Sequence, residues 1–241
     1  NSDATGAVGD VSILGALGGT TDLGSISVTG ATLSLQDVTT TGTQTYTAST
    51  GITTNSTYTS TDSAITFAGD VTIADAANGM SVDTGAGAGT ITFTGAVDSE
   101  ADETNDLTLT AGTGNVDLQG DAGLGASGEL GAFEIVSATQ VDLGSVEADS
   151  IAVSSATNID LNGTTYTAAT GSLSMADPVD LDAGAVTTTL TASTASTGGV
   201  TLGQVVDGGD DTTLAVDVGG NNLDLSNASN DLSTLIITAS N

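Results

Sequence analysis

The chain has 241 residues, of which none is lysine, arginine or histidine and 30 are aspartate or glutamate, so its formal net charge is -30. This composition excludes catalytic centres built on an imidazole or a lysine. It also excludes binding to nucleic acid or to an anionic membrane face, because both need basic side chains. The partners that remain are divalent cations, neutral glycans and further copies of the chain.

Several broad classes of protein are also excluded by composition. Cysteine is absent, so neither a disulfide nor a thiolate metal site stabilises the fold. At 38% hydrophobic residues and a mean hydropathy of +0.19, the chain is too apolar for a disordered acidic tail. The chain has no run of 18 apolar residues, so no insertion into a membrane is predicted, and residues 1 to 30 lack the basic start of a signal peptide. Because the chain starts at Asn1, we interpret it as a processed subunit or an excised segment.

An apolar–polar–apolar triplet recurs along the whole chain, with central residues 18 to 32 positions apart in its main series. In a strand, such a triplet directs both apolar flanks to the core and its middle residue to water. Ten triplets form this series: Val11-Ser12-Ile13, Leu33-Ser34-Leu35, Ile65-Thr66-Phe67, Ile91-Thr92-Phe93, Val116-Asp117-Leu118, Val141-Asp142-Leu143, Ile159-Asp160-Leu161, Val179-Asp180-Leu181, Val200-Thr201-Leu202 and Leu223-Asp224-Leu225. This spacing is typical of one coil of a β-solenoid.

A second series of triplets lies between the first, so each coil should contain at least two strands. It comprises Ile26-Ser27-Val28, Met80-Ser81-Val82, Leu107-Thr108-Leu109, Phe133-Glu134-Ile135, Ile151-Ala152-Val153, Leu173-Ser174-Met175, Leu214-Ala215-Val216 and Leu235-Ile236-Ile237. Glycine, asparagine and aspartate cluster between the triplets, where tight corners need positive φ. The sequence therefore predicts one all-β domain over residues 1–241, a right-handed parallel β-helix of about ten coils.

Segments such as residues 89–97, 106–116 and 43–47 resemble the repeats of large bacterial surface proteins of the filamentous haemagglutinin and autotransporter-passenger kind. The resemblance covers essentially the whole chain. It implies a right-handed parallel β-helix on the cell surface that serves in adhesion or as a stalk. It carries no catalytic signature with it, and the complete absence of basic residues departs from what such adhesins are expected to contain.

Aspartate occupies the outward position of five triplets in the main series, and if the coils are in register these residues form a row. The row comprises Asp117, Asp142, Asp160, Asp180 and Asp224, with Thr201 interrupting it. Like charges on neighbouring strands repel, and Ca²⁺ that bridges their oxygen atoms would convert this repulsion into attraction. The row is therefore a candidate calcium-binding face; the alternative is a solvated ladder that monovalent salt screens.

Two loops are denser in acid than the rest of the chain and are further candidate calcium sites. The first contributes Asp98, Glu100 and Asp102, and the second contributes Asp207, Asp210 and Asp211. Neither matches the EF-hand loop or the nonapeptide calcium roll. The alternative interpretation of each is a polar corner insertion that keeps the chain soluble.

These observations favour an extracellular structural protein, a subunit or segment of a surface filament, fibre or sheath, over an enzyme. The first alternative is a stalk segment of a large secreted adhesin. The second is a β-helix glycoside hydrolase, because that chemistry needs only two carboxylates; against it, the chain has no tryptophan to stack on sugars.

Sequons at Asn55, Asn162 and Asn227 permit N-glycosylation. The apolar last triplet predicts end-to-end association with another copy or with flanking coils.

Overall fold

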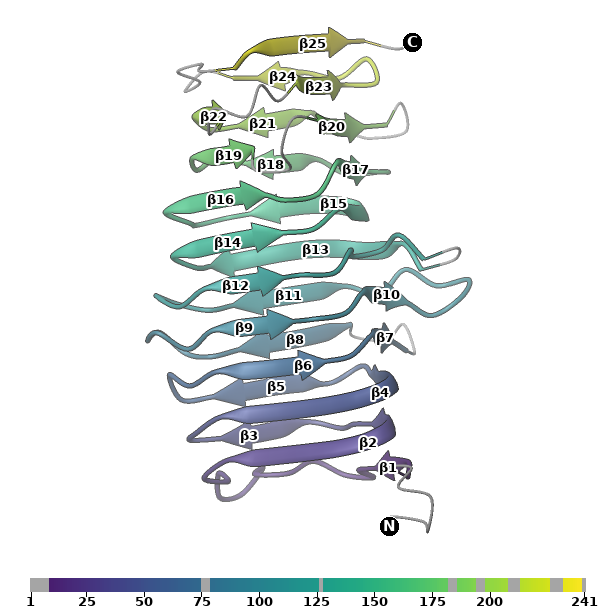
Figure 1. Ribbon diagram of the computed structural model, residues 1–241, viewed down its shortest axis with the longest axis vertical. Helices are drawn as coiled ribbons and strands as arrows, with labels where there is room; N and C mark the ends of the chain where they lie inside the picture. The colour runs from purple at the N-terminus through teal and green to yellow at the C-terminus, as the bar shows by residue number, and fades with distance from the viewer. Residues whose placement is uncertain are drawn as a thin grey trace.

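The computed structural model describes residues 9–74, 79–125, 128–181, 186–193, 198–207, 213–225 and 232–239. Every regular element in these ranges is a strand, and the strands stack in parallel as a β-solenoid of about nine turns (Figure 1). The predicted all-β coil is confirmed, with about nine turns in place of ten. Across the described ranges, no helix is long and apolar enough to cross a membrane.

The strands form three columns, which the chain visits in the same order in each turn. Column one comprises β2 (Ile26–Ser34, first half), β4 (Gln44–Thr54, first half), β6 (Ile65–Ala68), β9 (Ile91–Phe93), β12 (Val116–Leu118), β14 (Gln140–Leu143), β16 (Asn158–Leu161), β19 (Val179–Leu181) and β22 (Val205–Asp207). These strands face the viewer in Figure 1 and run to the right as the chain rises, while the column behind them runs to the left, so the coil is right-handed.

Columns two and three complete each turn. Column two comprises β1 (Val11–Ser12), the second halves of β2 and β4, β7 (Val71–Ile73), β10 (Val97–Ser99), the first half of β15 (Val146–Val153), β17 (Thr165–Ala168), β20 (Thr187–Ala192), β23 (Thr213–Asp217) and β25 (Thr234–Thr238). Column three comprises β3 (Val38–Thr40), β5 (Thr57–Ser60), β8 (Met80–Asp83), β11 (Leu107–Thr110), β13 (Leu130–Ser137), the second half of β15, β18 (Leu173–Met175), β21 (Val200–Leu202) and β24 (Leu223–Asp224).

The three columns correct the predicted spacing of the coils. Along column one, the residues that pair in register are 18 to 26 positions apart, at Val28, Tyr46, Phe67, Phe93, Leu118, Leu143, Leu161, Leu181 and Asp207. The predicted 32-residue step joins Ser34 in column two to Thr66 in column one, so it does not measure a turn. The triplets centred on Thr201 and Asp224 likewise lie in column three.

The core follows from the period-two alternation, because the apolar flanks of each strand point into the column and are buried. Its bulkiest part is an aromatic stack near the N-terminal end. Tyr46, Phe67 and Phe93 occupy successive paired positions of column one, with ring centroids 5.1 Å and 4.8 Å apart. Tyr58 packs edge-on against both Tyr46 and Phe67.

The tyrosine hydroxyls inside the column form hydrogen bonds with neighbouring side chains and backbone. The Tyr46 hydroxyl donates to Gln44 Oε1 at 2.9 Å, and Gln44 Nε2 donates to the carbonyl of Thr59 at 2.8 Å. The Tyr166 hydroxyl donates to the carbonyl of Leu143 at 3.0 Å. Burial raises the pKa of all three tyrosines above its ordinary value, so each phenol stays protonated. The tyrosines are therefore structural rather than platforms for sugars.

Aspartates at the corners connect one turn to the next. In each case a carboxylate oxygen accepts a backbone N–H about one turn away, at 2.6 to 3.1 Å; all of these aspartates lie between strands except Asp98, which lies in β10. The acceptor and donor pairs are Asp37 and Thr57, Asp62 and Gly87, Asp70 and Ala96, Asp98 and Gly125, Asp106 and Ala132, Asp121 and Ser145, and Asp177 and Ala156. Many acidic residues thus have a structural role, since an ionised acceptor strengthens a hydrogen bond.

Candidate functional site

The first candidate site is the acidic ladder, which we define as Asp117, Asp142, Asp160 and Asp180. These residues pair directly with one another across β12, β14, β16 and β19 in the outward positions of column one. All four are half-buried. Neighbouring strands lie about 4.8 Å apart, so the ladder holds four carboxylates in line on one face, as the predicted register requires.

Amide side chains donate to the carboxylates of the ladder. Gln140 Nε2 donates to Asp142 Oδ1 at 3.2 Å and also to Asp160 Oδ2, while Asn158 Nδ2 donates to Asp160 Oδ1. Gln119 Nε2 donates to Asp117 Oδ2 at 2.8 Å. These neutral donors offset part of the repulsion between aligned carboxylates, which no basic side chain in this protein can do.

The ladder ends differently from the prediction at its C-terminal side. Asp180 pairs with Val206, so the residue after the fourth aspartate in this row is apolar. Asp224 pairs instead with Thr201 in column three, on another face of the solenoid. The predicted fifth member was wrong because triplets of the same apolar–aspartate–apolar pattern occur in different columns, and a triplet alone does not identify its column.

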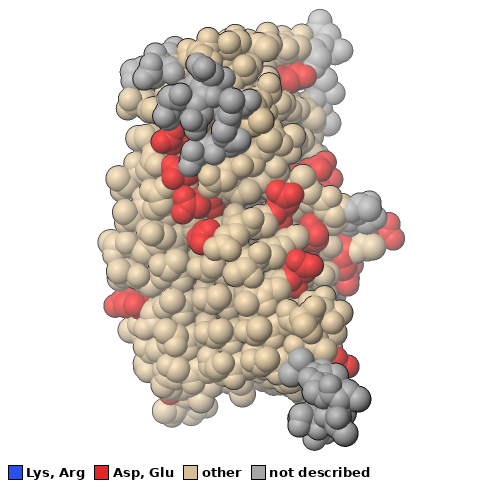
Figure 2. Space-filling view, viewed as in Figure 1, with Lys and Arg blue, Asp and Glu red and all other residues tan. Residues whose placement is uncertain are grey.

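Uncharged residues continue the same row toward the N-terminal end. Ser27, Thr45, Thr66 and Thr92 pair in sequence below Asp117. Figure 2 shows the result: the acidic atoms gather over the middle and upper part of this face, and the lower part is mostly free of them. Charge is therefore segregated along the column, with hydroxyls over the early turns and carboxylates over the later ones.

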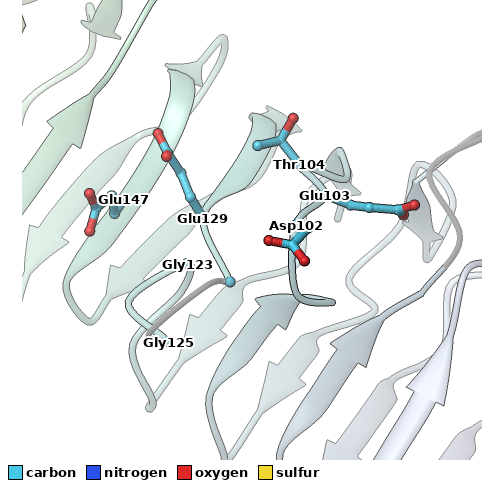
Figure 3. Close-up of a pocket in the computed structure, with 8 residues that line it drawn as sticks. Asp102, Glu103, Thr104, Gly123, Gly125, Glu129 and Glu147 are labelled. Atoms are coloured by element: carbon cyan, nitrogen blue, oxygen red, sulfur yellow. The ribbon is translucent and has the colours of Figure 1, made fainter.

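The second candidate site is an acidic pocket of about 550 Å³ between successive corner loops. It is lined by Asp102, Glu103, Thr104, Gly123, Gly125, Gly128, Glu129 and Glu147. In Figure 3 the Asp102 carboxylate points toward the side of the pocket that holds Glu129, whereas the Glu103 carboxylate extends away from it. Carboxylates from three turns thus surround one opening.

Glycines allow the loops to approach closely enough to form the acidic pocket. Gly123 has a φ of +72°, and a Cβ there would lie 1.9 Å from the carbonyl oxygen of Glu147. A Cβ at Gly128 would lie 2.7 Å from the Cβ of Asp98. Any larger residue at these positions would force the loop away from its neighbours. The pocket therefore depends on the backbone as much as on its carboxylates.

Two carboxylates, Glu129 in the pocket and Asp98 beside it, have pKa values raised above the ordinary value. Burial raises the pKa of Glu129, and the negative charges of Asp149 and Glu147 raise it further. Its Oε1 atom is buried without a hydrogen-bond partner. Burial also raises the pKa of Asp98, although N–H groups of Gly125 and Gly123 oppose the shift by donating to its carboxylate. Both groups thus bind a proton more readily than a solvated carboxylate does.

The predicted acidic loops are only partly assembled into sites. Asp102 lines the pocket. Asp98 lies in β10, and its carboxylate accepts the N–H of Gly125. Glu100 follows β10, and its backbone N–H donates to the carbonyl of Ile73. In the second loop, Asp207 ends β22 opposite Leu181, while Asp210 and Asp211 lie outside the described residues.

The three glycosylation sequons differ in exposure. Asn55 is half-buried and Asn162 is exposed, while Asn227 lies outside the described part of the chain.

Sequence reasoning missed Glu103, Glu129 and Glu147 as members of one pocket. Glu129 lies 26 positions after Glu103, which is about one turn, so the coil spacing itself was the signal that could have paired them. Among the described residues, no group of three or more acidic side chains is arranged to hold a metal ion. Calcium binding at the eleven predicted residues therefore stays a prediction.

Comparison with known proteins leaves the fold as the sole guide. No protein-family model matches this chain, and no curated protein or solved structure matches it. The structure is that of a β-solenoid repeat protein. Its two acidic sites must therefore be interpreted from their own geometry.

Proposed function

We propose that this protein is an extracellular structural protein, a subunit or segment of a cell-surface filament, fibre or sheath. The observation that carries the proposal is the pair of parallel sheets, one running from β1 to β22 and the other from β3 to β25, whose strands stack turn upon turn around one hydrophobic core. Such a column is rigid and extended, because each turn contacts only its neighbours and all of them share the core. Its length is built from repeats, as a structural spacer requires.

An extracellular location agrees with the resistance to proteolysis expected of this chain. It contains no lysine or arginine, so trypsin-like proteases have no cleavage site. Most of its backbone N–H groups are held in ladders or corner bonds, and these restrict the local opening on which other proteases depend. The likeness to filamentous haemagglutinin and autotransporter passengers supports the same location, and makes an adhesin stalk the nearest alternative within the structural class.

Divalent cations are the proposed stabilisers of the column. The acidic ladder aligns four carboxylates, and its amide donors offset only part of their repulsion. Ca²⁺ accepts carboxylate and amide oxygens in irregular geometry, so it suits a ladder better than a cation with strict geometry does. Cations bound along this face would stiffen the later turns without any dedicated loop.

The proposed function is tested by locating the protein and imaging it. Antibodies against the chain should label intact source cells, and negative-stain images of the purified protein should show rods or fibres. Labelling that requires permeabilised cells would contradict the extracellular role. Compact, non-fibrous particles that remain separate at every concentration would contradict the filament and leave the stalk as the structural alternative.

A second candidate function, glycoside hydrolysis, is favoured by the acidic pocket alone. Glu129 has a raised pKa and could act as the general acid, with Asp102 or Glu147 as the ionised partner. The test is release of reducing ends from neutral polysaccharides by the wild-type protein and by Glu129→Gln. Activity that the substitution abolishes would establish the enzyme; inactivity on both α- and β-linked substrates would contradict it.

A further inference from the structure

The corner between β16 and β17 contains a chemically labile pair of residues, Asn162-Gly163. Asn162 is exposed and Gly163 is buried. Asparagine is among the side chains that degrade in water, and it degrades fastest before glycine, whose missing Cβ lets the next backbone nitrogen approach the asparagine side chain. The reaction needs only water, so this corner carries a site of self-modification inside the column.

Deamidation at this corner starts at the backbone nitrogen of Gly163. That nitrogen loses its proton to solvent and attacks Cγ of Asn162, so that a new C–N bond closes a five-membered imide. The side-chain nitrogen takes up a proton and leaves as ammonia. Water then adds to one of the two imide carbonyls and breaks its bond to the ring nitrogen. The products are aspartate, or isoaspartate with the main chain running through the former side chain.

The structure holds this attacking nitrogen in two hydrogen bonds. The N–H of Gly163 donates to the Tyr166 hydroxyl at 2.9 Å and to the carbonyl of Leu143 at 3.1 Å. Tyr166 is fully buried, and its hydroxyl donates onward to the same Leu143 carbonyl at 3.0 Å. A bonded amide releases its proton only when the local structure opens. The folded corner therefore withholds the group that would start the reaction.

The turn below fixes the rest of the corner. The N–H of Asn162 donates to the carbonyl of Leu143 at 2.9 Å. The N–H of Thr164 donates to the hydroxyl of Ser145 at 3.1 Å. A Cβ at Gly163 would lie 2.2 Å from the backbone nitrogen of Ser145, so the packing of the two turns requires glycine here. The same glycine makes the pair labile, and the hydrogen bonds around it offset that lability.

We propose that Asn162 is a latent deamidation site, which the Tyr166 hydroxyl and the Leu143 carbonyl keep unreactive while the column is folded. The inference goes beyond the proposed structural function. Conversion to aspartate would add a charge two residues after Asp160, a member of the acidic ladder that already bears aligned like charges. Conversion to isoaspartate would lengthen the main chain of the corner. Either product records irreversibly that this corner has opened.

The test compares the rate of conversion of Asn162 in the folded chain and in the same chain unfolded in urea, both at neutral pH. Tandem mass spectrometry of peptic fragments measures it, because trypsin has no cleavage site. The unfolded chain should convert faster. Tyr166→Phe removes one acceptor of the Gly163 N–H and should accelerate conversion in the folded chain about 5-fold. Tyr58→Phe, the matched control, removes a buried hydroxyl that bonds Thr54 instead and should leave the rate unchanged.

Hydrogen exchange at Gly163, followed by NMR, measures the opening of the corner independently. Exchange and deamidation both need the same N–H to be released, so the protection of this amide should match the slowing of deamidation relative to the unfolded chain. Three results would overturn the proposal: equal conversion of Asn162 in the folded and unfolded wild type, equal acceleration by Tyr166→Phe and Tyr58→Phe, or rapid exchange at Gly163 in a chain whose Asn162 stays intact. None of these results bears on the proposed structural function.

Discussion

Asp142 and Asp160 lie directly opposite each other in the ladder between β14 and β16, and the single amide of Gln140 donates to both of their carboxylates. Two like charges on adjacent strands would normally repel. Here a neutral donor shared between them performs the task that a lysine or arginine performs in most proteins. The fold thus accommodates its charge by hydrogen bonds from amides and backbone groups.

Removing the shared amide should destabilise the column in a salt-dependent way. Gln140→Ala leaves Asp142 and Asp160 opposed without their common donor, and we expect a loss of about 1 kcal/mol in the free energy of unfolding. High salt should recover part of that loss by screening. Urea denaturation at low and high salt measures both effects. Gln119→Ala, whose amide donates to Asp117 alone, is the control and should show a smaller salt effect.

Calcium should raise the melting temperature through the acidic ladder. Melting in millimolar CaCl₂ should occur above melting in EDTA, because a bridging cation converts repulsion into attraction. The difference should shrink in the double variant Asp142→Asn, Asp160→Asn, which removes two charges from the centre of the ladder. Identical melting temperatures in calcium and EDTA for the wild type would show that monovalent ions and amides suffice.

Strand content and alternation could be predicted from the sequence, because the side-chain period of two is local and each triplet carries it. The column to which a triplet belongs could not be predicted from the sequence, because it depends on how many residues each corner contains. Asp160 and Asp224 are each flanked by two aliphatic residues, yet they lie on different faces. The acidic pocket escaped prediction for the same reason: the segments that carry Glu103 and Glu129 line one pocket only because they lie about one full turn apart.

Neutralising Glu129 should stabilise the protein near neutral pH. Its pKa is raised in the folded state, so the folded protein binds this proton more tightly than the unfolded chain does, and ionisation lowers stability as pH rises through the folded value. Glu129→Gln removes that cost. Thermal melting across pH should show the variant above the wild type at pH 7, with the gap closing on acidification. Glu134→Gln controls for the change in net charge.

Loss of a corner aspartate should loosen the contact between two turns. Asp106 Oδ1 accepts the N–H of Ala132 at 2.7 Å, across 26 residues of sequence. Asp106→Ala removes this acceptor and should cost about 1 kcal/mol, whereas Asp106→Asn keeps an acceptor oxygen and should cost less. Amide hydrogen exchange at Ala132 should accelerate in the alanine variant. Unchanged protection there would mean that the carboxylate bond contributes nothing to the corner.

The aromatic stack should contribute most to stability in the N-terminal half of the column. Phe67 is fully buried between Tyr46 and Phe93, and Tyr58 packs against its edge. Phe67→Ala opens a cavity in the core and should cost about 3 to 5 kcal/mol. Thr66→Ala changes the adjacent outward position of β6 and should be nearly neutral. Because neighbouring turns share the core, hydrogen exchange in the Phe67 variant should rise first in β4 and β9 and only later in the distant β19. A uniform rise along the whole column would show instead that all turns unfold as a single unit.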